Sequence, residues 1–176
     1  MRILPYFSRL AEFRVYDAKV AHVARNLCEA IETIAPELRV EHVGSTSVPG
    51  CGGKGIVDLA ILYPDDFLAR ARATLDDLGF QKQGGREPFP ESRPMRVGCV
   101  ELEGQSFRIH AHVIALGSEE HQELVWFREA LRVSSDLRHG YENRKLAILA
   151  SGIQDSIEYC KAKGVFITEA LTEEQF

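Results

Sequence analysis

The sequence predicts an α+β (mixed α/β) fold, in which a small mixed sheet is flanked by helices. Near the start of the chain and again after residue 119, apolar residues recur every three or four positions, as they do on a helix that packs one face against a core. Between these regions lie four short segments rich in β-branched and aromatic residues, which favour strands. Because both patterns occur along one chain, we expect four strands in a mixed sheet with helices packed around it.

The first half of the chain predicts a helix, two strands and a second helix. Apolar residues follow helical spacing over residues 13–34, until a proline ends the pattern. Strands are expected over 39–43 and 56–63, and the glycines and proline between them exclude a regular element there. A second helix with one apolar stripe follows the second strand and ends at Gly79. This order predicts a strand, a glycine-rich loop and a strand, with a helix on either side.

The second half predicts a flap, a hairpin and a helical tail. Residues 81–96 contain three prolines, two adjacent glycines and mixed charges, which is too long and polar for a routine connection. Strands are expected over 97–103 and 107–116, joined by a turn at Gly104. From residue 119 the pattern is helical, and a break at Gly152 precedes the last of about three segments. We therefore expect a helical C-terminal tail beside the sheet.

Length and composition predict a single domain, residues 1–176. The chain has 45% hydrophobic and 27% charged residues, enough for one buried core. Its formal net charge of -5 argues against broad binding to nucleic acid. No apolar run reaches the roughly 20 residues of a membrane span, and the start lacks a secretion signal. Its four cysteines are widely spaced, as expected of reduced thiols, so we expect a cytoplasmic protein.

The loop after the first strand is a candidate phosphate site. Gly44 and Ser45 follow an apolar strand, and small residues let backbone N–H groups approach an anion closely. The loop is not a P-loop, because Gly55 follows Lys54 where that motif needs a hydroxyl. Lys54 is a point charge suited to phosphate. A tight structural turn with a solvated lysine is the alternative interpretation.

Asp58 interrupts an apolar strand and needs a partner. Alternation places it on the same face as Ile56, Ala60 and Leu62. A carboxylate in such surroundings is costly unless a cation, a basic side chain or several N–H donors face it. We expect a metal-binding or catalytic role, because such carboxylates cluster at sites. The alternative is a buried salt bridge, with Arg108 as the candidate partner.

A later strand carries three basic side chains on one face. Alternation in FRIHAHVI sends Arg108, His110 and His112 to one side of the sheet and the apolar residues to the other. Two imidazoles two positions apart can converge on one ion, or can orient a phosphate and an acid. An exposed sheet face is the alternative, since His-x-His alone is a weak signal.

The helical tail and the flap add further candidates. Tyr141 and Lys145 are four positions apart, so on a helix they share a face and could reach a phosphate or a base; an ordinary surface pair is the alternative. One of the flap arginines Arg86, Arg93 and Arg96 could close over a triphosphate. Glu87 and Glu91 dilute their charge, which argues against a nucleic-acid patch.

Several of these segments together resemble the GrpB family, which belongs to the nucleotidyltransferase superfamily. The likeness covers nearly the whole chain and is least at residues 84–96. It rests on EHVGSTSVPG at 41–50, GKGIVDLAI at 53–61, RIHAHVIALGS at 108–118 and, in the tail, WFREAL, Tyr141 with Lys145, and KAKGVFITEAL. The resemblance implies a minimal nucleotidyltransferase core, with the helical tail beside the site.

The superfamily pattern is only partly present. It consists of a Gly-Ser turn, a strand with Asp-x-Asp or Asp-x-Glu, and a third carboxylate on a later strand. Gly44 and Ser45 match the turn and Asp58 the first carboxylate, whereas Ala60 occupies the second position. The expected position of the third carboxylate falls in the strand that carries His110 and His112. Asp58 is then the one matching carboxylate, and a single aspartate cannot hold two magnesium ions. Some GrpB-like domains are fused to dephospho-coenzyme A kinase, which points toward coenzyme A metabolism.

The leading hypothesis is a metal-dependent enzyme that transfers a nucleotidyl or phosphoryl group from an NTP to a small-molecule or protein hydroxyl. Asp58, His110 and His112 would form the catalytic and metal site for Mg²⁺, Mn²⁺ or Zn²⁺, and the mixed oxygen and nitrogen donors favour manganese or zinc. The triphosphate would be held by the residues Gly44, Ser45, Thr46, Ser47, Lys54, Arg108 and Lys145. One alternative is a non-catalytic nucleotide- or phosphate-binding module, favoured by Ala60; another is a metal-dependent hydrolase.

Overall fold

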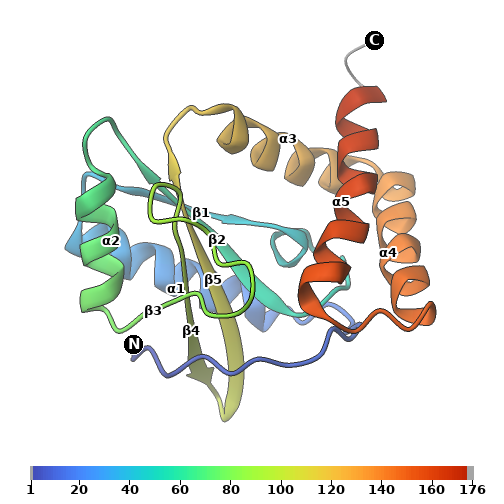
Figure 1. Cartoon of the computed structure of the whole chain (residues 1–176), viewed down its shortest axis with the longest axis horizontal. Coiled ribbons are helices and arrows are strands. Elements are labelled where there is room, and N and C mark those ends of the chain that lie inside the picture. The colour runs from blue at the N-terminus through green and yellow to red at the C-terminus, as the bar shows by residue number, and fades with distance from the viewer. Residues whose placement is uncertain (1, 174–176) are drawn as a thin grey trace.

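The computed structural model describes residues 2–173, which form a five-stranded mixed sheet with helices on both faces (Figure 1). The strand order is β1-β2-β5-β4-β3. The strands are β1 (Arg39–Val43), β2 (Ile56–Tyr63), β3 (Gln81–Lys82), β4 (Met95–Leu102) and β5 (Gln105–Ala115). The helices are α1 (Lys19–Ile34), α2 (Leu68–Asp77), α3 (Glu119–Val133), α4 (Ser135–Ala150) and α5 (Ser156–Glu173). The predicted mixed α/β class is confirmed.

The register of the central strands positions the polar side chains. β2 and β5 run parallel, with Asp58 opposite His110 and Ala60 opposite His112. The other neighbours, β1 with β2, β4 with β5 and β3 with β4, are antiparallel. Because side chains alternate across a strand, Asp58 and both histidines lie on the same face of the sheet.

The two faces of the sheet are covered differently. Helices α1 and α2 pack on one face, where alternate residues of β2 and β5, such as Leu59 and Ile109, are buried in the main core. On the opposite face Ala60, Leu62 and Ile114 pack with Leu124 of α3. Helices α4 and α5 lie beyond one end of the sheet, on the side of the glycine-rich loop (Figure 1). The polar side chains thus share the α3 face with a small apolar cluster.

Two predicted elements differ from the structure. The sheet has five strands rather than four, because Gln81 and Lys82 at the start of the flap pair with β4 as a short edge strand. The first helix begins at Lys19 rather than at residue 13, because Arg14 forms backbone hydrogen bonds in both directions with Gly53, of 2.7 and 2.9 Å. The backbone at Arg14 therefore pairs with the glycine-rich loop and is not available for a helical turn.

A buried arginine anchors the flap. Residues 83–94 are neither helix nor strand. At their base Arg96 of β4 is only 1% exposed. It donates to Asp76 Oδ1 of α2 at 2.6 Å and to Glu91 Oε2 of the flap at 3.0 Å. Burial alone would lower the pKa of Arg96, but the two carboxylates outweigh it and raise that pKa. The flap is therefore fixed to α2 through a charged guanidinium.

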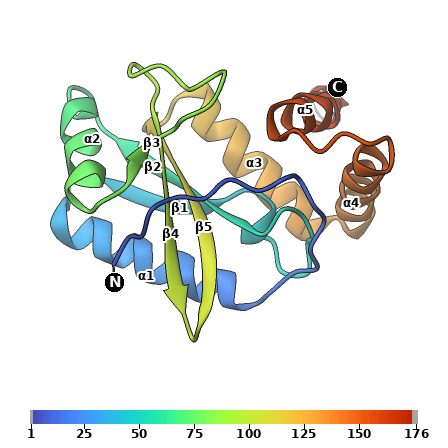
Figure 2. The same ribbon diagram turned by 60° about the horizontal axis from the view of Figure 1, so that its bottom comes forward.

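The N-terminal segment, residues 2–17, crosses one face of the sheet as an extended chain (Figure 2). Leu4 pairs with Cys99 of β4, and Ala11 N donates to Gln154 O between α4 and α5 at 2.8 Å. Together with the Arg14 pairing, these bonds tie the segment to the sheet, the glycine-rich loop and the helical tail. Among residues 2–173, no helix combines the length and apolar character that crossing a membrane requires.

Candidate functional site

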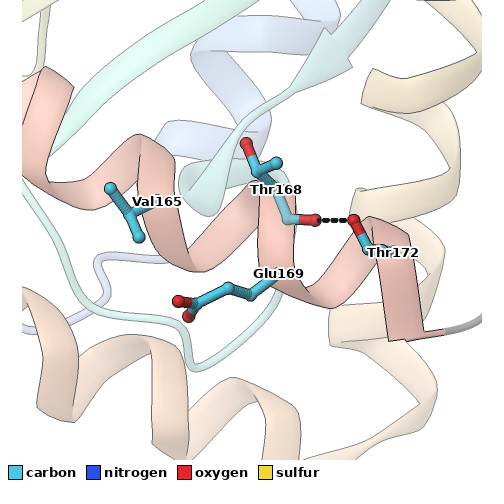
Figure 3. Close-up of a pocket in the computed structure, with 4 residues that line it drawn as sticks. All are labelled: Val165, Thr168, Glu169 and Thr172. Carbon is cyan, nitrogen blue, oxygen red and sulfur yellow. Dashed lines mark hydrogen bonds between the residues drawn. The ribbon is translucent and has the colours of Figure 1, made fainter.

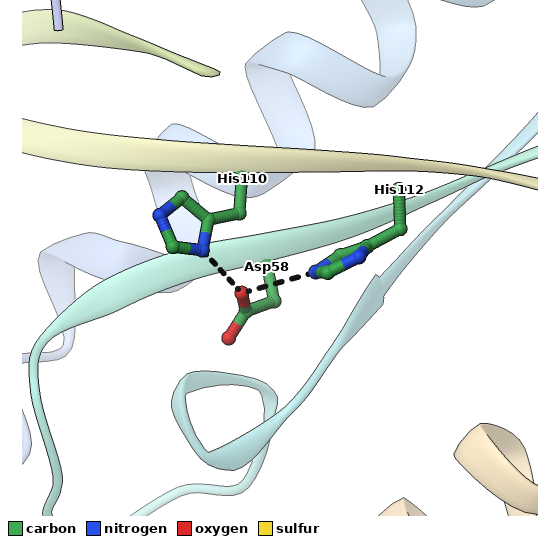
Figure 4. A group of neighbouring side chains, drawn as sticks. All are labelled: Asp58, His110 and His112. Carbon is green, nitrogen blue, oxygen red and sulfur yellow. Dashed lines mark ion pairs between the residues drawn. The ribbon is translucent and has the colours of Figure 1, made fainter. Parts of the chain in front are cut away.

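Asp58, His110 and His112 converge on the α3 face of the sheet (Figure 4). His110 Nδ1 lies 3.5 Å and His112 Nε2 3.6 Å from Asp58 Oδ1. One ligand atom from each residue falls within 4.8 Å of the other two. The parallel register of β2 and β5 produces this convergence, because it sets Asp58 directly beside His110. His112 lies two residues further along β5, on the same face of the sheet.

The two imidazoles stabilise the charge of Asp58. Burial alone would raise the pKa of Asp58, but the neighbouring imidazoles of His110 and His112 outweigh it and hold that pKa well below its usual range. Burial lowers the pKa of His110, despite its contact with Asp58. Arg108 donates instead to the backbone oxygen of Lys54 at 3.1 Å. The close side-chain contacts of Asp58 are therefore with the imidazoles and not with Arg108.

The glycine-rich turn packs directly on Asp58. Gly44 has a φ of 70°, and a Cβ at this position would lie 2.6 Å from Asp58 Oδ2. Both the backbone conformation and the close approach therefore require glycine. Ser45–Ser47 form a single 3₁₀ turn, in which the backbone N–H and the hydroxyl of Ser47 both donate to Gly44 O, at 3.1 and 2.6 Å.

Thr46 joins this turn to both flanking strands. Its hydroxyl donates to Ile56 O of β2 at 2.9 Å and accepts from His42 Nε2 of β1 at 3.0 Å. Burial lowers the pKa of His42 to about 4, so this ring is neutral near pH 7. Sequence reasoning did not single out His42, whose one signal is its place two residues before the turn.

His42→Gln should make the protein less sensitive to acid. The pKa of His42 is about 4 when folded and about 6.5 when unfolded, so between these values only the unfolded chain takes up the proton. Wild-type stability therefore falls as pH drops from 6.5 toward 4, by at most ~1.4 kcal/mol per pH unit from this residue. Urea unfolding at pH 7 and pH 5 measures the difference. His139→Gln, which removes an exposed histidine, is the control; an unchanged acid loss in His42→Gln would contradict the prediction.

The two candidate lysines lie on the side of the loop that faces the helical tail. Lys145 of α4 is buried, donates to Gly52 O and lies 4.1 Å from the ring centre of Tyr141. Burial lowers the pKa of Lys145. A Cβ on Gly53 would lie 2.9 Å from Ser45 Oγ and 3.3 Å from Lys145 Nζ, so this lysine is close to the turn. Lys54 Nζ instead lies 3.5 Å from both a hydroxyl and a thiol of α5.

Tyr141 is mainly a packing residue in this structure. Its ring is 3% exposed and lies between Phe127 of α3 and Phe166 of α5, with ring centres 5.1 and 5.6 Å away. Burial raises the pKa of its hydroxyl. The helical spacing that predicted a shared face with Lys145 is correct, but that face is buried between the helices rather than exposed.

A second layer of side chains contacts the histidines. Tyr6 Oη of the N-terminal segment lies 3.0 Å from His110 Nε2. Arg93 of the flap donates to His112 Nδ1 at 3.2 Å and forms an ion pair with Glu120 of α3. Tyr6 and Glu120 were missed by sequence reasoning, because no local pattern connects either of them to the histidine strand. Arg93 is one of the three flap arginines considered for closing over a triphosphate, and here it contacts an imidazole.

A separate hollow lies on helix α5 and is lined by Val165, Thr168, Glu169 and Thr172 (Figure 3). Its threonines are engaged within the helix, since Thr172 Oγ1 donates to Thr168 O at 2.8 Å. Its lining offers one carboxylate and no basic group. This hollow therefore does not share the chemistry of the Asp58 site.

Comparison with solved structures defines the class of the fold, which is that of the nucleotidyltransferases. A structure of the Cid1 poly(U) polymerase with its short product ApU matches with a TM-score of 0.51 and 15% identity, over 74% of this chain and 41% of that chain. GrpB from Enterococcus faecalis matches with a TM-score of 0.69 and 20% identity, over 94% of this chain and 100% of that chain.

The chain belongs to the GrpB family. The family model described as GrpB protein matches residues 11–173. A UPF0157 protein of Streptomyces coelicolor is 31% identical over 154 residues, which is 84% of this chain and 75% of the relative. A UPF0157 protein of Vibrio cholerae is 26% identical over 156 residues, 89% of this chain and 78% of the relative. The predicted family is thereby confirmed.

Proposed function

We propose that this protein binds a divalent metal ion through Asp58, His110 and His112 and transfers a nucleotidyl or phosphoryl group from an NTP to a hydroxyl. The observation that carries this proposal is the convergence of one carboxylate oxygen and two imidazole nitrogens within 4.8 Å, directly beside the Gly44 turn. The nucleotidyltransferase fold supports the class of reaction.

The residues around the turn bind the triphosphate in this proposal. Backbone N–H groups of Gly44, Ser45 and Thr46 face the phosphates, because small side chains let an anion approach them closely. The N–H of Ser47 donates to Gly44 O instead, so Ser47 shapes the turn. Lys145 supplies positive charge close to the turn, near Gly53. Lys54 supplies it from the side of the loop that contacts α5. Arg108 supports the loop, because its guanidinium donates a hydrogen bond to the backbone oxygen of Lys54.

The donor set selects the metal. The ligands supply two nitrogens and one carboxylate, which suits Mn²⁺ or Zn²⁺ better than Mg²⁺, an ion that prefers oxygen ligands. Ala60 lies opposite His112, so β2 contributes one carboxylate to this face and not two. When bound, the ion acts as a Lewis acid that offsets charge on the phosphoryl oxygens. Asp58 and the two imidazoles hold it, and the turn keeps the triphosphate next to it.

Calorimetry tests this proposal. Metal-free protein is titrated with Mg²⁺, Mn²⁺ and Zn²⁺, and the protein loaded with each metal is then titrated with ATP, GTP, CTP and UTP. We expect Mn²⁺ or Zn²⁺ to bind more tightly than Mg²⁺, and at least one NTP to bind more tightly to loaded than to metal-free protein. If no metal binds, or if metal has no effect on any nucleotide, the proposal is wrong.

Ala60 favours a second candidate, a non-catalytic module that binds a nucleotide or another phosphorylated ligand through the turn. With one carboxylate on β2, the two-metal arrangement of the superfamily is incomplete. This candidate requires nucleotide binding without metal and no turnover on long incubation, which distinguishes it from the first. The single-domain organisation of residues 1–176, a cytoplasmic location and a link to coenzyme A metabolism stay predictions.

A further inference from the structure

We propose that Arg93 and Tyr6 act on the candidate metal site in opposite ways: Arg93 holds His112 in a form that cannot ligate, and Tyr6 supports His110 as a ligand. The inference rests on the proposed metal site. It concerns which ring nitrogen carries the proton in each histidine, because a nitrogen that carries a proton has no lone pair for a metal.

At His112 the contact with Arg93 fixes the form of the ring. Nδ1 lies 3.2 Å from Arg93 Nη1, and Nε2 faces Asp58 Oδ1 at 3.6 Å. A guanidinium has five N–H donors, no acceptor, and keeps its charge. Nδ1 must therefore accept, so the neutral ring carries its proton on Nε2. The nitrogen that faces Asp58 is then a donor and cannot bind a metal.

At His110 the neighbour permits either form. Nδ1 faces Asp58 Oδ1 at 3.5 Å, and Nε2 lies 3.0 Å from Tyr6 Oη. A phenol hydroxyl can both donate and accept. When Nδ1 serves as a ligand, Nε2–H donates to Tyr6 Oη without any movement of Tyr6. This is the outer contact that metal-bound imidazoles usually make, and losing it typically weakens metal binding 10- to 100-fold.

Metal binding at His112 Nε2 therefore requires Arg93 to leave Nδ1. Arg93 is carried by the flap, whose residues 83–94 form no helix or strand. It has two other partners, the carboxylate of Glu120, 3.0 Å from its Nε, and the ring of Phe89, whose centre lies 4.3 Å from its Cζ. The guanidinium can keep these contacts while it gives up the imidazole. In the arrangement seen here, Arg93 therefore keeps His112 Nε2 as a donor.

Metal affinity in matched variants tests the inference. Zn²⁺ and Mn²⁺ titrations compare the wild type with Arg93→Gln, Arg93→Met and Tyr6→Phe. Both Arg93 variants remove a positive charge, but only glutamine offers an oxygen that accepts from Nδ1–H. We expect Arg93→Gln to bind metal about 10-fold more tightly than wild type and more tightly than Arg93→Met, and Tyr6→Phe to bind about 10-fold more weakly. Arg86→Met is the control, since Arg86 lies in the same flap and pairs with Asp155.

The outcomes separate this inference from the proposed function. If no protein in the series binds metal, the proposed function is wrong and the inference fails with it. If the wild type binds metal and Arg93→Gln binds no more tightly, the inference alone is wrong. Equal gains in Arg93→Gln and Arg93→Met would also overturn it, because charge removal would then explain the whole effect. Thermal unfolding confirms that each variant is folded before titration.

A spectroscopic measurement tests the form of the ring without metal. Long-range ¹H–¹⁵N spectra distinguish a neutral imidazole that carries its proton on Nε2 from one that carries it on Nδ1. In metal-free wild type we expect the His112 signals, identified by their loss in His112→Gln, to report Nε2–H. In Arg93→Gln we expect a shift toward Nδ1–H. A wild-type His112 ring with its proton on Nδ1 would overturn the inference.

Discussion

Asp58→Asn is expected to abolish metal binding. The substitution replaces the one carboxylate of the three converging ligands with a neutral amide of the same shape, so the remaining donors are two imidazoles. The loss in affinity should exceed ~100-fold, the upper end of what removing an outer contact costs. Zn²⁺ and Mn²⁺ titrations measure it. Metal-dependent nucleotide binding should be lost in parallel.

The matched control is Asp65→Asn, which removes the same charge from an exposed position just after the same strand. It should leave metal affinity unchanged, so any general effect of net charge appears in both variants. Asp58→Asn should also remain folded, because the new amide can still accept a hydrogen bond from the neighbouring imidazoles. Wild-type metal affinity in a folded Asp58→Asn protein would exclude the site proposed here.

Gly44→Ala is expected to cost about 2–4 kcal/mol of folding free energy and to weaken metal binding. An alanine at a φ of 70° is strained, and its Cβ would lie 2.6 Å from Asp58 Oδ2. The strain and the clash add together, and relief of the clash moves the carboxylate away from the imidazoles. Urea unfolding measures the stability loss, and metal titration measures the displacement of Asp58.

Gly50→Ala separates the two causes. Gly50 lies in the same loop with a φ of 80°, and nothing lies within 4 Å of a Cβ built on it. Its substitution therefore introduces the backbone strain, about 1–2 kcal/mol, without the clash. Metal affinity should be unaffected. Equal stability losses in the two variants, with metal binding intact in both, would show that the close approach of Gly44 to Asp58 has no consequence.

Alternation along single strands was enough to predict which side chains share a face. It placed Asp58 among apolar residues and His110 with His112 on one side of their strand, and both placements hold in the structure. The pairing of the two strands could not be derived in this way. That Asp58 lies opposite His110 depends on the parallel register of β2 and β5, which no local pattern encodes.

The errors at the ends of elements have a common cause in distant backbone partners. Residues 13–18 have helical spacing, but Arg14 pairs with Gly53, and that pairing replaces the first expected turns of helix. Gln81 and Lys82 were predicted as part of the flap, and they form a strand because they pair with β4. The same reason explains why Tyr6 was missed, since it is 104 positions from His110. Contacts of this range follow from the fold and not from spacing.

The N-terminal segment has a practical consequence for homology-guided protein production. The family match begins at residue 11, whereas the hydroxyl that faces His110 belongs to Tyr6 and the pairing with Cys99 belongs to Leu4. A polypeptide trimmed to the matched boundaries would retain every candidate ligand on β2 and β5 and still expose one imidazole to solvent. Affinities measured on such a shortened protein would describe an altered coordination environment, so biochemical assays should use a protein that includes residues 2–10.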